Sequence, residues 1–470
     1  SIVRKISEII MAFMAKSGLY TGVDIGTNTI KVLVAEYVSG EMNIIGVGNA
    51  KSDGLKNGII VDIEKVAQAL RKAVNAAEER AGITIDRINV SIPANSLEME
   101  PCQGMVPIVS ETKEITDNDV IQVVQNALMR GIVPEREIIA LETKEFTVDG
   151  FTGISDPRGM FGVRLEIRGV VYTGPKTLVH NVRKVVERAG LIVDNIVIAP
   201  LAMAQYVLTE GEREFGTIMV DLGAGQTTVS AVKEQALRFT HTSPEGGDYV
   251  TKDISTVLNT SLSAAEDLKV NYGEASTERA SQDEYFLVDV VGKDEPEQVT
   301  EYYLSQIIEA RMTQIFDRVR QDLDHGHTFE TPGGLILVGG TAAMPGVVDL
   351  ATKALGMNAR LFVPGEMGLR NPAFAQVISV VSYVGNRSDI DVLVSQAFSG
   401  DYAYTAAEET YVAPVTTVPT QTTTVPANVE NDFYVEPQAR PVATQKATEP
   451  EEDKEGLMDR AKNFFGNLFD

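Results

Sequence analysis

The chain has 470 residues, 44% of them apolar, with a formal net charge of -25 and a pI near 4.6. This length predicts about two to four domains with buried cores. The excess of acids argues against a nucleic-acid binder and against the body lying unaided on an anionic membrane. The single Cys102 excludes an internal disulfide and fits a reducing compartment, and no apolar run reaches the roughly 20 residues that span a bilayer.

Residues 1–14 are predicted to be an N-terminal extension, with the natural start at Met11 or Met14. A basic start followed by a short apolar run is also the layout of a signal peptide. Glu8 directly before that run, and Lys16 soon after it, favour the extension.

From about residue 20 to 383, short β-rich runs alternate with helical stretches. Two helices are predicted at 62–82 and 176–190, each closed by a glycine. Strands are predicted at 31–37, 87–92, 169–174, 195–199, 216–222 and 334–340. Alternation of this kind predicts an α/β architecture with largely buried sheets.

Two stretches about 200 residues apart resemble each other. "GVDIGTNTIKVLVAE" (22–36) and "MVDLGAGQTTVSAVK" (219–233) each read as an apolar strand, Asp-x-Gly, small polar residues and a second strand. The alternative is coincidence, because Asp and Gly favour turns anyway. The flanking strands on both sides favour two related domains, each with one phosphate-binding hairpin.

Each hairpin places a carboxylate at the end of a strand, beside backbone that phosphate can approach. Asp24 and Asp221 would face each other and hold Mg²⁺ through waters, because Mg²⁺ dehydrates reluctantly. Lys31 would pair with a phosphate oxygen as a point charge. Gly26 and Gly223 would keep side chains away, and the predicted donors are Thr27, Asn28, Gln226 and Thr227.

Three further elements add candidate nucleotide contacts. "LILVGGTAAMPG" (335–346) places Gly339, Gly340 and Thr341 after a strand, where backbone can approach a sugar, a base or a phosphate, although a tight turn alone explains the glycines. Gly246 and Gly247 precede a helix. Glu266 and Lys269 share a helical face and could flank a ribose or purine, with a surface ion pair as the alternative.

The two hairpins and the Gly-Gly-Thr loop, in this order, resemble the actin-like ATPase superfamily, which includes actin, chaperone ATPases, sugar kinases and bacterial filament proteins. Within it, "DIGTNTIKVLVAE", "GIIVDIEKV" and the stretch from about 84 to 168 resemble the FtsA family of bacterial cell division. The resemblance implies an actin-like (ribonuclease-H-like) two-domain α/β fold with an inserted small α+β subdomain. The implied domains are 15–83 with 169–199, the insert 84–168, and 200–390.

The resemblance also implies a function. ATP with Mg²⁺ would lie between the two lobes, against Asp24 to Lys31, against Gly223, Gly225 and Thr227, and beside the Gly-Gly-Thr loop. The family polymerises head to tail on the inner face of the cell membrane at the septum, recruits later division proteins, and binds the tail of the tubulin-like FtsZ. That docking site maps to about 250–325, with Arg311 as a candidate anchor.

One departure concerns hydrolysis. Many relatives have an acid before the proline of the connecting helix, where it helps to orient the attacking water. Ala199 stands there in "VIAPLAMAQY" and cannot polarise water. Gln205 is the nearest polar alternative and receives no role. We therefore expect ATP binding with slow hydrolysis at best.

The C-terminal part changes in composition. Residues 397–450 are predicted to form a disordered acidic Pro/Thr-rich linker, and residues 451–470 an amphipathic helix on the membrane. On a helical wheel the apolar residues lie within an arc of roughly 140°, with two cations at its edges and acids opposite. These residues are Leu457, Met458, Ala461, Phe464, Phe465, Leu468 and Phe469, with Arg460 and Lys462 at the edges.

Two alternatives share the fold. A soluble actin-fold kinase would need a positioned carboxylate base for a substrate hydroxyl, and none stands out. A pilus-assembly ATP-binding adaptor would not need the linker and the terminal stripe. The terminal stripe could also dock on the body or on a partner protein instead of on lipid, because amphipathic stripes commonly cover a core.

Overall fold

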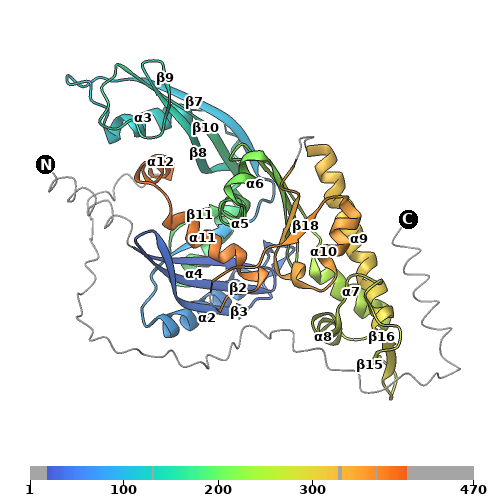
Figure 1. The fold of residues 1–470 in the computed structure, drawn as a ribbon. Coiled ribbons are helices and arrows are strands. Elements are labelled where there is room, and N and C mark those ends of the chain that lie inside the picture. Colours follow the sequence, from blue (N-terminus) through green and yellow to red (C-terminus); the bar gives the residue numbers. More distant parts are fainter. Residues whose placement is uncertain (1–17, 130–131, 327–330, 367, 400–470) are drawn as a thin grey trace, which may run out of the picture.

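The computed structural model describes residues 18–129, 132–326, 331–366 and 368–399 (Figure 1). A five-stranded sheet forms the centre of its first half, in the order β11-β6-β1-β2-β3. The first three strands form an antiparallel meander, and β6 and β11 add in parallel beside β1. The strands are β1 (Gly18–Ile25), β2 (Thr29–Val38), β3 (Glu41–Lys51), β6 (Arg87–Ile92) and β11 (Ile192–Ile198).

The second half contains a sheet with the same plan, in the order β18-β17-β12-β13-β14. Again three antiparallel strands are followed by two parallel ones beside the first strand. Its strands are β12 (Thr217–Leu222), β13 (Thr227–Lys233), β14 (Ala236–Ser243), β17 (Leu335–Val338) and β18 (Ala359–Leu361). The similarity of 22–36 to 219–233 therefore reflects two equivalent β-hairpins.

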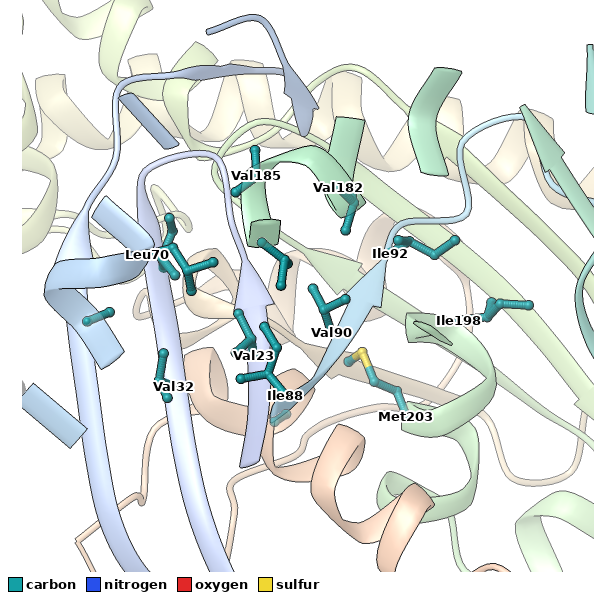
Figure 2. Close-up of a cluster of buried hydrophobic side chains, with 14 of the residues drawn as sticks. Val23, Val32, Leu70, Ile88, Val90, Ile92, Val182, Val185, Ile198 and Met203 are labelled. Atoms are coloured by element: carbon teal, nitrogen blue, oxygen red, sulfur yellow. The ribbon is translucent and has the colours of Figure 1, made fainter. Parts of the chain in front are cut away.

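Helices α2 (Ile63–Ala81) and α4 (Lys176–Arg188) cover one face of the first sheet. The Asp62 side chain caps α2 by accepting from the Lys65 amide at 3.1 Å, and Gly82 ends the helix at φ +68°, as a C-terminal glycine does. Valine, leucine and isoleucine side chains from both helices and from β1, β2 and β6 fill the space between them (Figure 2).

The remaining helices of the second half surround its sheet and include the longest one described. A two-stranded hairpin, β15 (Tyr285–Val288) with β16 (Glu297–Thr300), precedes that long helix, α9. In Figure 1 this hairpin lies at the end of the molecule away from the insert. The helices are α6 (Glu210–Phe215), α7 (Gly247–Leu258), α8 (Leu262–Tyr272), α9 (Glu301–Gly326) and α10 (Val347–Leu355).

The insert is a four-stranded antiparallel sheet, β7-β10-β8-β9, with one helix packed on it. Its elements are β7 (Glu98–Pro107), α3 (Asp117–Ala127), β8 (Arg136–Val148), β9 (Phe151–Ile154) and β10 (Arg164–Pro175). Strand β6 lies after the predicted boundary at 84, but it pairs with β1 and β11 in the sheet of the first half. The boundary at 168/169 divides the continuous strand β10.

The end of the described chain returns to the first half. Helix α5 (Ala199–Val207) and helix α11 (Ala375–Gly385) pack together, and α11 covers β1, β2 and β6. Residues 375–385, which fall within the predicted second domain of 200–390, therefore pack on the first sheet. Helix α12 (Asp389–Ser399) packs on α3 and β8 of the insert, so the linker predicted from 397 starts within its last turn.

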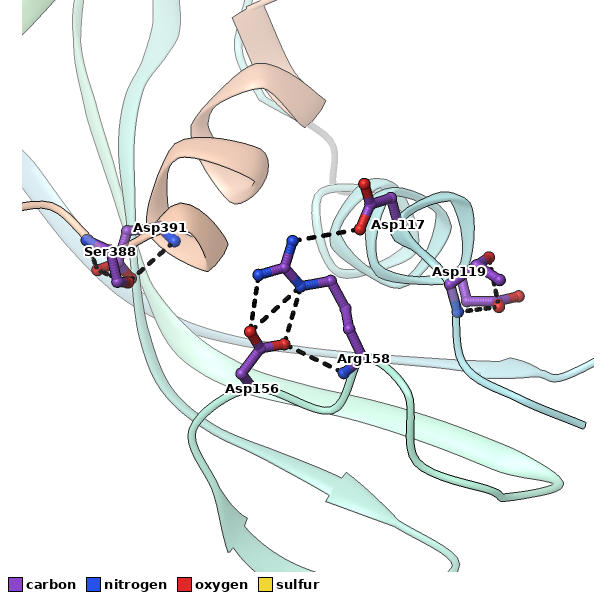
Figure 3. A network of polar contacts seen from close by, with 7 residues as sticks. Asp117, Asp119, Asp156, Arg158, Ser388 and Asp391 are labelled. Carbon is purple, nitrogen blue, oxygen red and sulfur yellow. Dashed lines mark hydrogen bonds and ion pairs between the residues drawn. The ribbon is translucent and has the colours of Figure 1, made fainter. Parts of the chain in front are cut away.

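Polar contacts near this junction fix two helix starts (Figure 3). Ser388 caps α12, since its hydroxyl accepts from the Asp391 amide at 3.4 Å and the Asp391 carboxylate accepts from the Ser388 amide at 3.3 Å. Arg158 joins Asp156, at 2.7 Å, to Asp117 at the start of α3, at 3.3 Å. The hydrogen bond from Arg158 lowers the pKa of Asp156, so this clamp is charged at neutral pH.

The predictions for 1–14, 400–450 and 451–470 lie outside the described residues. Within the described ranges, every helix is too short or too polar to cross a membrane.

Candidate nucleotide site

A cavity of about 580 Å³ lies between the two halves and is lined by both. Its size falls within the range of small-molecule sites. The first half lines it with hairpin β1–β2, residues 91–94 and the start of α5, and the second half lines it with hairpin β12–β13, the end of helix α8 and the loop after β17. Residues 371–376 complete the lining. Most sequence-predicted residues line it: Asp24, Gly26, Thr27, Asn28, Lys31, Asp221, Gly223, Gly225, Glu266, Lys269, Gly339, Gly340 and Thr341.

The two aspartates occupy equivalent places in the two sheets but have different neighbours. Asp24 lies opposite Lys31 on β2, and the Lys31 ammonium is 3.7 Å from its carboxylate. Asp221 lies opposite Thr228, which brings no charge. The first carboxylate therefore has its own counter-ion, and the second does not.

This difference explains the electrostatics of the site. Burial raises the pKa of Asp24, but Lys31 opposes that rise. Burial, and then the neighbouring charge of Asp24, raise the pKa of Asp221 to about 7. Two carboxylates at the floor of one cavity, one of them short of a cation, form a donor set that fits Mg²⁺ held through water and phosphate oxygens.

No group of three or more His, Cys, Asp or Glu side chains suited to a metal occurs in the described part of the chain. A magnesium ion at Asp24 and Asp221 would therefore take most of its ligands from water and a bound phosphate, as Mg²⁺ commonly does.

Sequence reasoning missed Gln376, which reaches the site from α11. Its amide donates to Asp24 at 3.0 Å and to the Ser91 hydroxyl at 2.9 Å. Ser91 in turn donates to the Val23 carbonyl at 3.3 Å. Nothing in the local pattern of 371–379 indicates this contact, because it joins residues 352 positions apart.

Tight turns hold the backbone of both hairpins. The Gly26 amide donates to the Thr29 carbonyl at 3.1 Å, and the Gly223 amide donates to Gln226 at 3.0 Å. Gly339 has φ +93°, and a Cβ there would lie 2.5 Å from Asp221, so only glycine lets this loop pass the carboxylate. The Thr341 hydroxyl donates to the Gly223 carbonyl at 3.0 Å and joins the loop to the second hairpin.

Glu266 and Lys269 form the expected pair, at 2.8 Å, on the cavity side of α8. The Lys269 ammonium also donates to the Gly247 carbonyl at 3.1 Å. These contacts place one cation at the rim of the cavity, where it could contact a ligand.

The structure does not bring Thr227, Gly246 and Gly247 to the cavity surface. The Thr227 side chain is buried and its hydroxyl donates to the Glu245 carbonyl at 2.7 Å. Gly246 and Gly247 start helix α7 behind the second hairpin, and the Gly247 amide donates to Gly223 at 2.9 Å. Their geometry supports the hairpin and not direct contact with a ligand.

Ala199 lines the cavity at the start of α5, beside Pro200 and Met203. Gln205 is exposed on the same helix and does not line the cavity. The carboxylates among the described lining residues are Asp24, Asp221 and Glu266.

Arg311 is occupied within the fold. Its guanidinium binds the Asp253 carboxylate through two hydrogen bonds and donates to Gln314 at 2.6 Å, and it lies over the Tyr249 ring at 5.3 Å. Its side chain is only 12% exposed. A partner would have to compete with Asp253, so the geometry does not favour Arg311 as an anchor.

Two equivalent sheets around a cleft floored by paired aspartates define a protein of the actin-like class. Three family models match the chain: cell division protein FtsA over residues 218–379, the SHS2 domain inserted in FtsA over 94–173, and the FtsA C-terminal region over 390–470. The chain belongs to the FtsA family of cell division proteins.

The similarity of the chain to individual proteins agrees with this family assignment. The FtsA of Enterococcus faecalis is 52% identical over 97% of this chain and all of its own length. Among solved structures, a PilM–PilN type IV pilus biogenesis complex aligns at TM-score 0.55 and 16% identity, covering 78% of this chain and 99% of that one. MreB5 of Spiroplasma citri bound to ADP aligns at TM-score 0.50 and 11% identity, covering 79% and 98%. These two show the fold alone.

Proposed function

We propose that the cleft binds ATP with Mg²⁺. The observation that carries this proposal is the pair of equivalent aspartates, Asp24 and Asp221, at the floor of a cavity lined by two glycine-containing hairpins. The two carboxylates favour binding of a cation, and the bound cation would in turn attract the phosphate chain of a nucleotide. Lys31 and the hairpin amides would neutralise the phosphate oxygens, while the Gly339–Thr341 loop and Lys269 would lie near the nucleoside.

Hydrolysis by this site would be slow. General-base catalysis needs a carboxylate or other acceptor placed beside the attacking water. The helix that follows β11 starts with Ala199 and offers none, and Asp221 would be occupied with the cation. Rapid phosphate release by the purified chain would contradict this part of the proposal.

The wider role would be that of a tether. The chain would assemble head to tail, bind the FtsZ tail on the second half within about 250–325, and recruit later division proteins at the septum. Its attachment to the inner face of the membrane would depend on residues 451–470. Membership of the FtsA family, including the match of the C-terminal model to 390–470, supports these roles.

A pilus-assembly adaptor remains the alternative with a specific observation behind it, because a PilM–PilN complex shares the fold. The family match over the C-terminal 81 residues, from 390 to 470, favours the division protein.

Titration calorimetry with Mg·ATP tests the nucleotide proposal. The Asp221→Asn variant keeps the side-chain volume but loses the charge, so we expect its magnesium-dependent affinity to fall by at least about tenfold. Asp267→Asn, on the exposed side of α8, serves as the control and should bind as the unmodified chain does. Unchanged affinity in Asp221→Asn would mean that the paired aspartates are structural.

A further inference from the structure

The two phosphate-side hairpins touch each other directly across the cleft. A Cβ placed on Gly225 of the second hairpin would lie 2.3 Å from the Thr27 hydroxyl of the first. A Cβ on Gly58, whose amide donates to the same Thr27 hydroxyl at 2.9 Å, would lie 2.4 Å from the Gln226 side chain. The two halves are therefore in van der Waals contact at this end of the cavity.

One polar bond joins the halves at the same place. The Asn28 side-chain amide donates to the Asp248 carboxylate at 2.7 Å. Asn28 belongs to the first hairpin, and Asp248 lies in the first turn of α7 in the second half. A hydrogen bond to a carboxylate is stronger than one between neutral groups, so this is the most specific of these contacts between the two halves.

Both partners are held by their own backbones. The Asp248 amide donates to the Ala224 carbonyl at 2.8 Å, which ties the start of α7 to the second hairpin. The Asn28 carbonyl accepts from the Ser52 amide at 2.9 Å, which ties the first hairpin to the end of β3. The bond thus joins two fixed segments, and the halves cannot separate here while it is made.

Asp248 joins the two halves but does not itself line the cavity. Asn28 lines it, as do Thr27, Gly225 and Gln226, but Asp248 lies behind the second hairpin. Changing Asp248 therefore removes the bond between the halves without replacing a lining residue. The Asp248 carboxylate also interacts electrostatically with Lys269 and Glu266 at the rim, so its charge and its hydrogen bond have to be separated by experiment.

We infer that Asp248 is a positioning residue that holds the phosphate end of the cleft closed and thereby sets the rate of nucleotide exchange. The inference rests on the proposed nucleotide binding. A nucleotide whose phosphates contact both hairpins leaves only when the hairpins part, and a new one enters only through the same opening. Breaking the Asn28–Asp248 bond is part of that opening, so its loss accelerates both directions.

Stopped-flow fluorescence with a mant-labelled ADP measures both rates. Asp248→Ala loses the bond, and we expect its dissociation rate constant to rise by about tenfold, the effect of losing one charge-assisted hydrogen bond. The association rate constant should rise as well, so the dissociation constant changes less than either rate.

Asp248→Asn separates the bond from the charge. The asparagine side chain can still form a hydrogen bond with Asn28 but carries no charge. Like alanine, it also removes the favourable interaction between a negative charge and the N-terminus of α7. We expect its dissociation rate to stay within about threefold of that of the unmodified chain. Asp267→Ala, on the exposed side of α8, controls for removal of an acid near the site.

The outcomes are distinct. Fast exchange in Asp248→Ala with near-normal exchange in Asp248→Asn supports the inference. Equal exchange rates in these two variants, whether fast or normal, overturn it, because charge alone or nothing at all would then be responsible. If the unmodified chain binds no labelled nucleotide, the proposed function itself fails. Thermal melting of each variant checks that it is folded. If Asp248→Ala melts early, the exchange rate of Asp248→Asn, whose side chain has nearly the same shape as that of aspartate, is compared with that of the unmodified chain, and fast exchange in Asp248→Asn then overturns the inference.

Discussion

At the scale of single residues, the site combines two aspartates that the fold treats differently. Asp24 has Lys31 as a counter-ion and accepts a hydrogen bond from Gln376, whereas Asp221 faces neutral Thr228. Burial and the charge of Asp24 raise the pKa of Asp221 to about 7. Folding without a cation therefore leaves one carboxylate in an unfavourable state, which a bound magnesium ion would relieve.

This imbalance predicts a pH-dependent stability. Because the pKa of Asp221 is raised on folding, the folded chain holds a proton that the unfolded chain has released. The stability that this bound proton contributes is lost as the pH rises through about 7. Asp221→Asn should melt at a higher temperature than the unmodified chain at pH 8 without nucleotide, with a difference of a few degrees, roughly 2–4 °C for each kcal/mol. The difference should shrink towards pH 4.

Scanning calorimetry from pH 4 to pH 8 checks this. Asp24→Asn is the matched control and should gain less, because it leaves Lys31 without its ion-pair partner. A constant difference between Asp221→Asn and the unmodified chain across this pH range would show that Asp221 does not titrate there.

At the scale of elements, the pattern of apolar runs and glycines predicted the strands and helices that are local. The helix at 62–82 is bounded by Asp62 and Gly82 as expected, and the strand at 87–92 has its predicted bounds. The sheet to which that strand belongs was not predictable, because strand pairing depends on residues far apart in sequence. Gln376 was missed for the same reason, since it meets Asp24 only when α11 folds back onto the first sheet.

Helix α12 shows a further long-range contact. Its apolar side chains Ile390, Leu393, Val394 and Ala397 complete the core of the insert. The same core contains Cys102, the single cysteine of the chain, which is 6% exposed. The insert is therefore held by a helix that starts 214 residues after the end of β10 (389 − 175).

Leu393→Ala should destabilise this contact by about 2–4 kcal/mol, the usual range for removing a buried leucine side chain. Cys102 belongs to the same buried cluster, so loosening of that core should make its thiol react with a disulfide reagent several times faster than in the unmodified chain. Val392→Ala, on the same helix but outside that core, provides the comparison. Equal thiol reaction rates in the two variants would mean that α12 does not cover the core of the insert.

At the scale of the whole molecule, we propose separate roles for the fold and for the tail. The two equivalent halves would bind nucleotide and assemble, and the C-terminal stripe would attach each subunit to lipid. A single short helix with partly buried phenylalanines binds a bilayer weakly. Many such helices on one filament bind it strongly, because each attached subunit raises the effective concentration of the next. Assembly and membrane attachment should therefore depend on each other.

Electron microscopy of the purified chain on lipid monolayers tests this central claim most directly. With ATP and Mg²⁺, the full chain should form filaments on a monolayer that contains anionic lipid. A chain that ends at Pro450, and the full chain with Phe465→Asp, should form none there, because both lack the apolar stripe. Lys462→Glu should lose more filaments on anionic than on neutral lipid. Filaments of the truncated chain on lipid, or filaments of the full chain without nucleotide, would contradict the account.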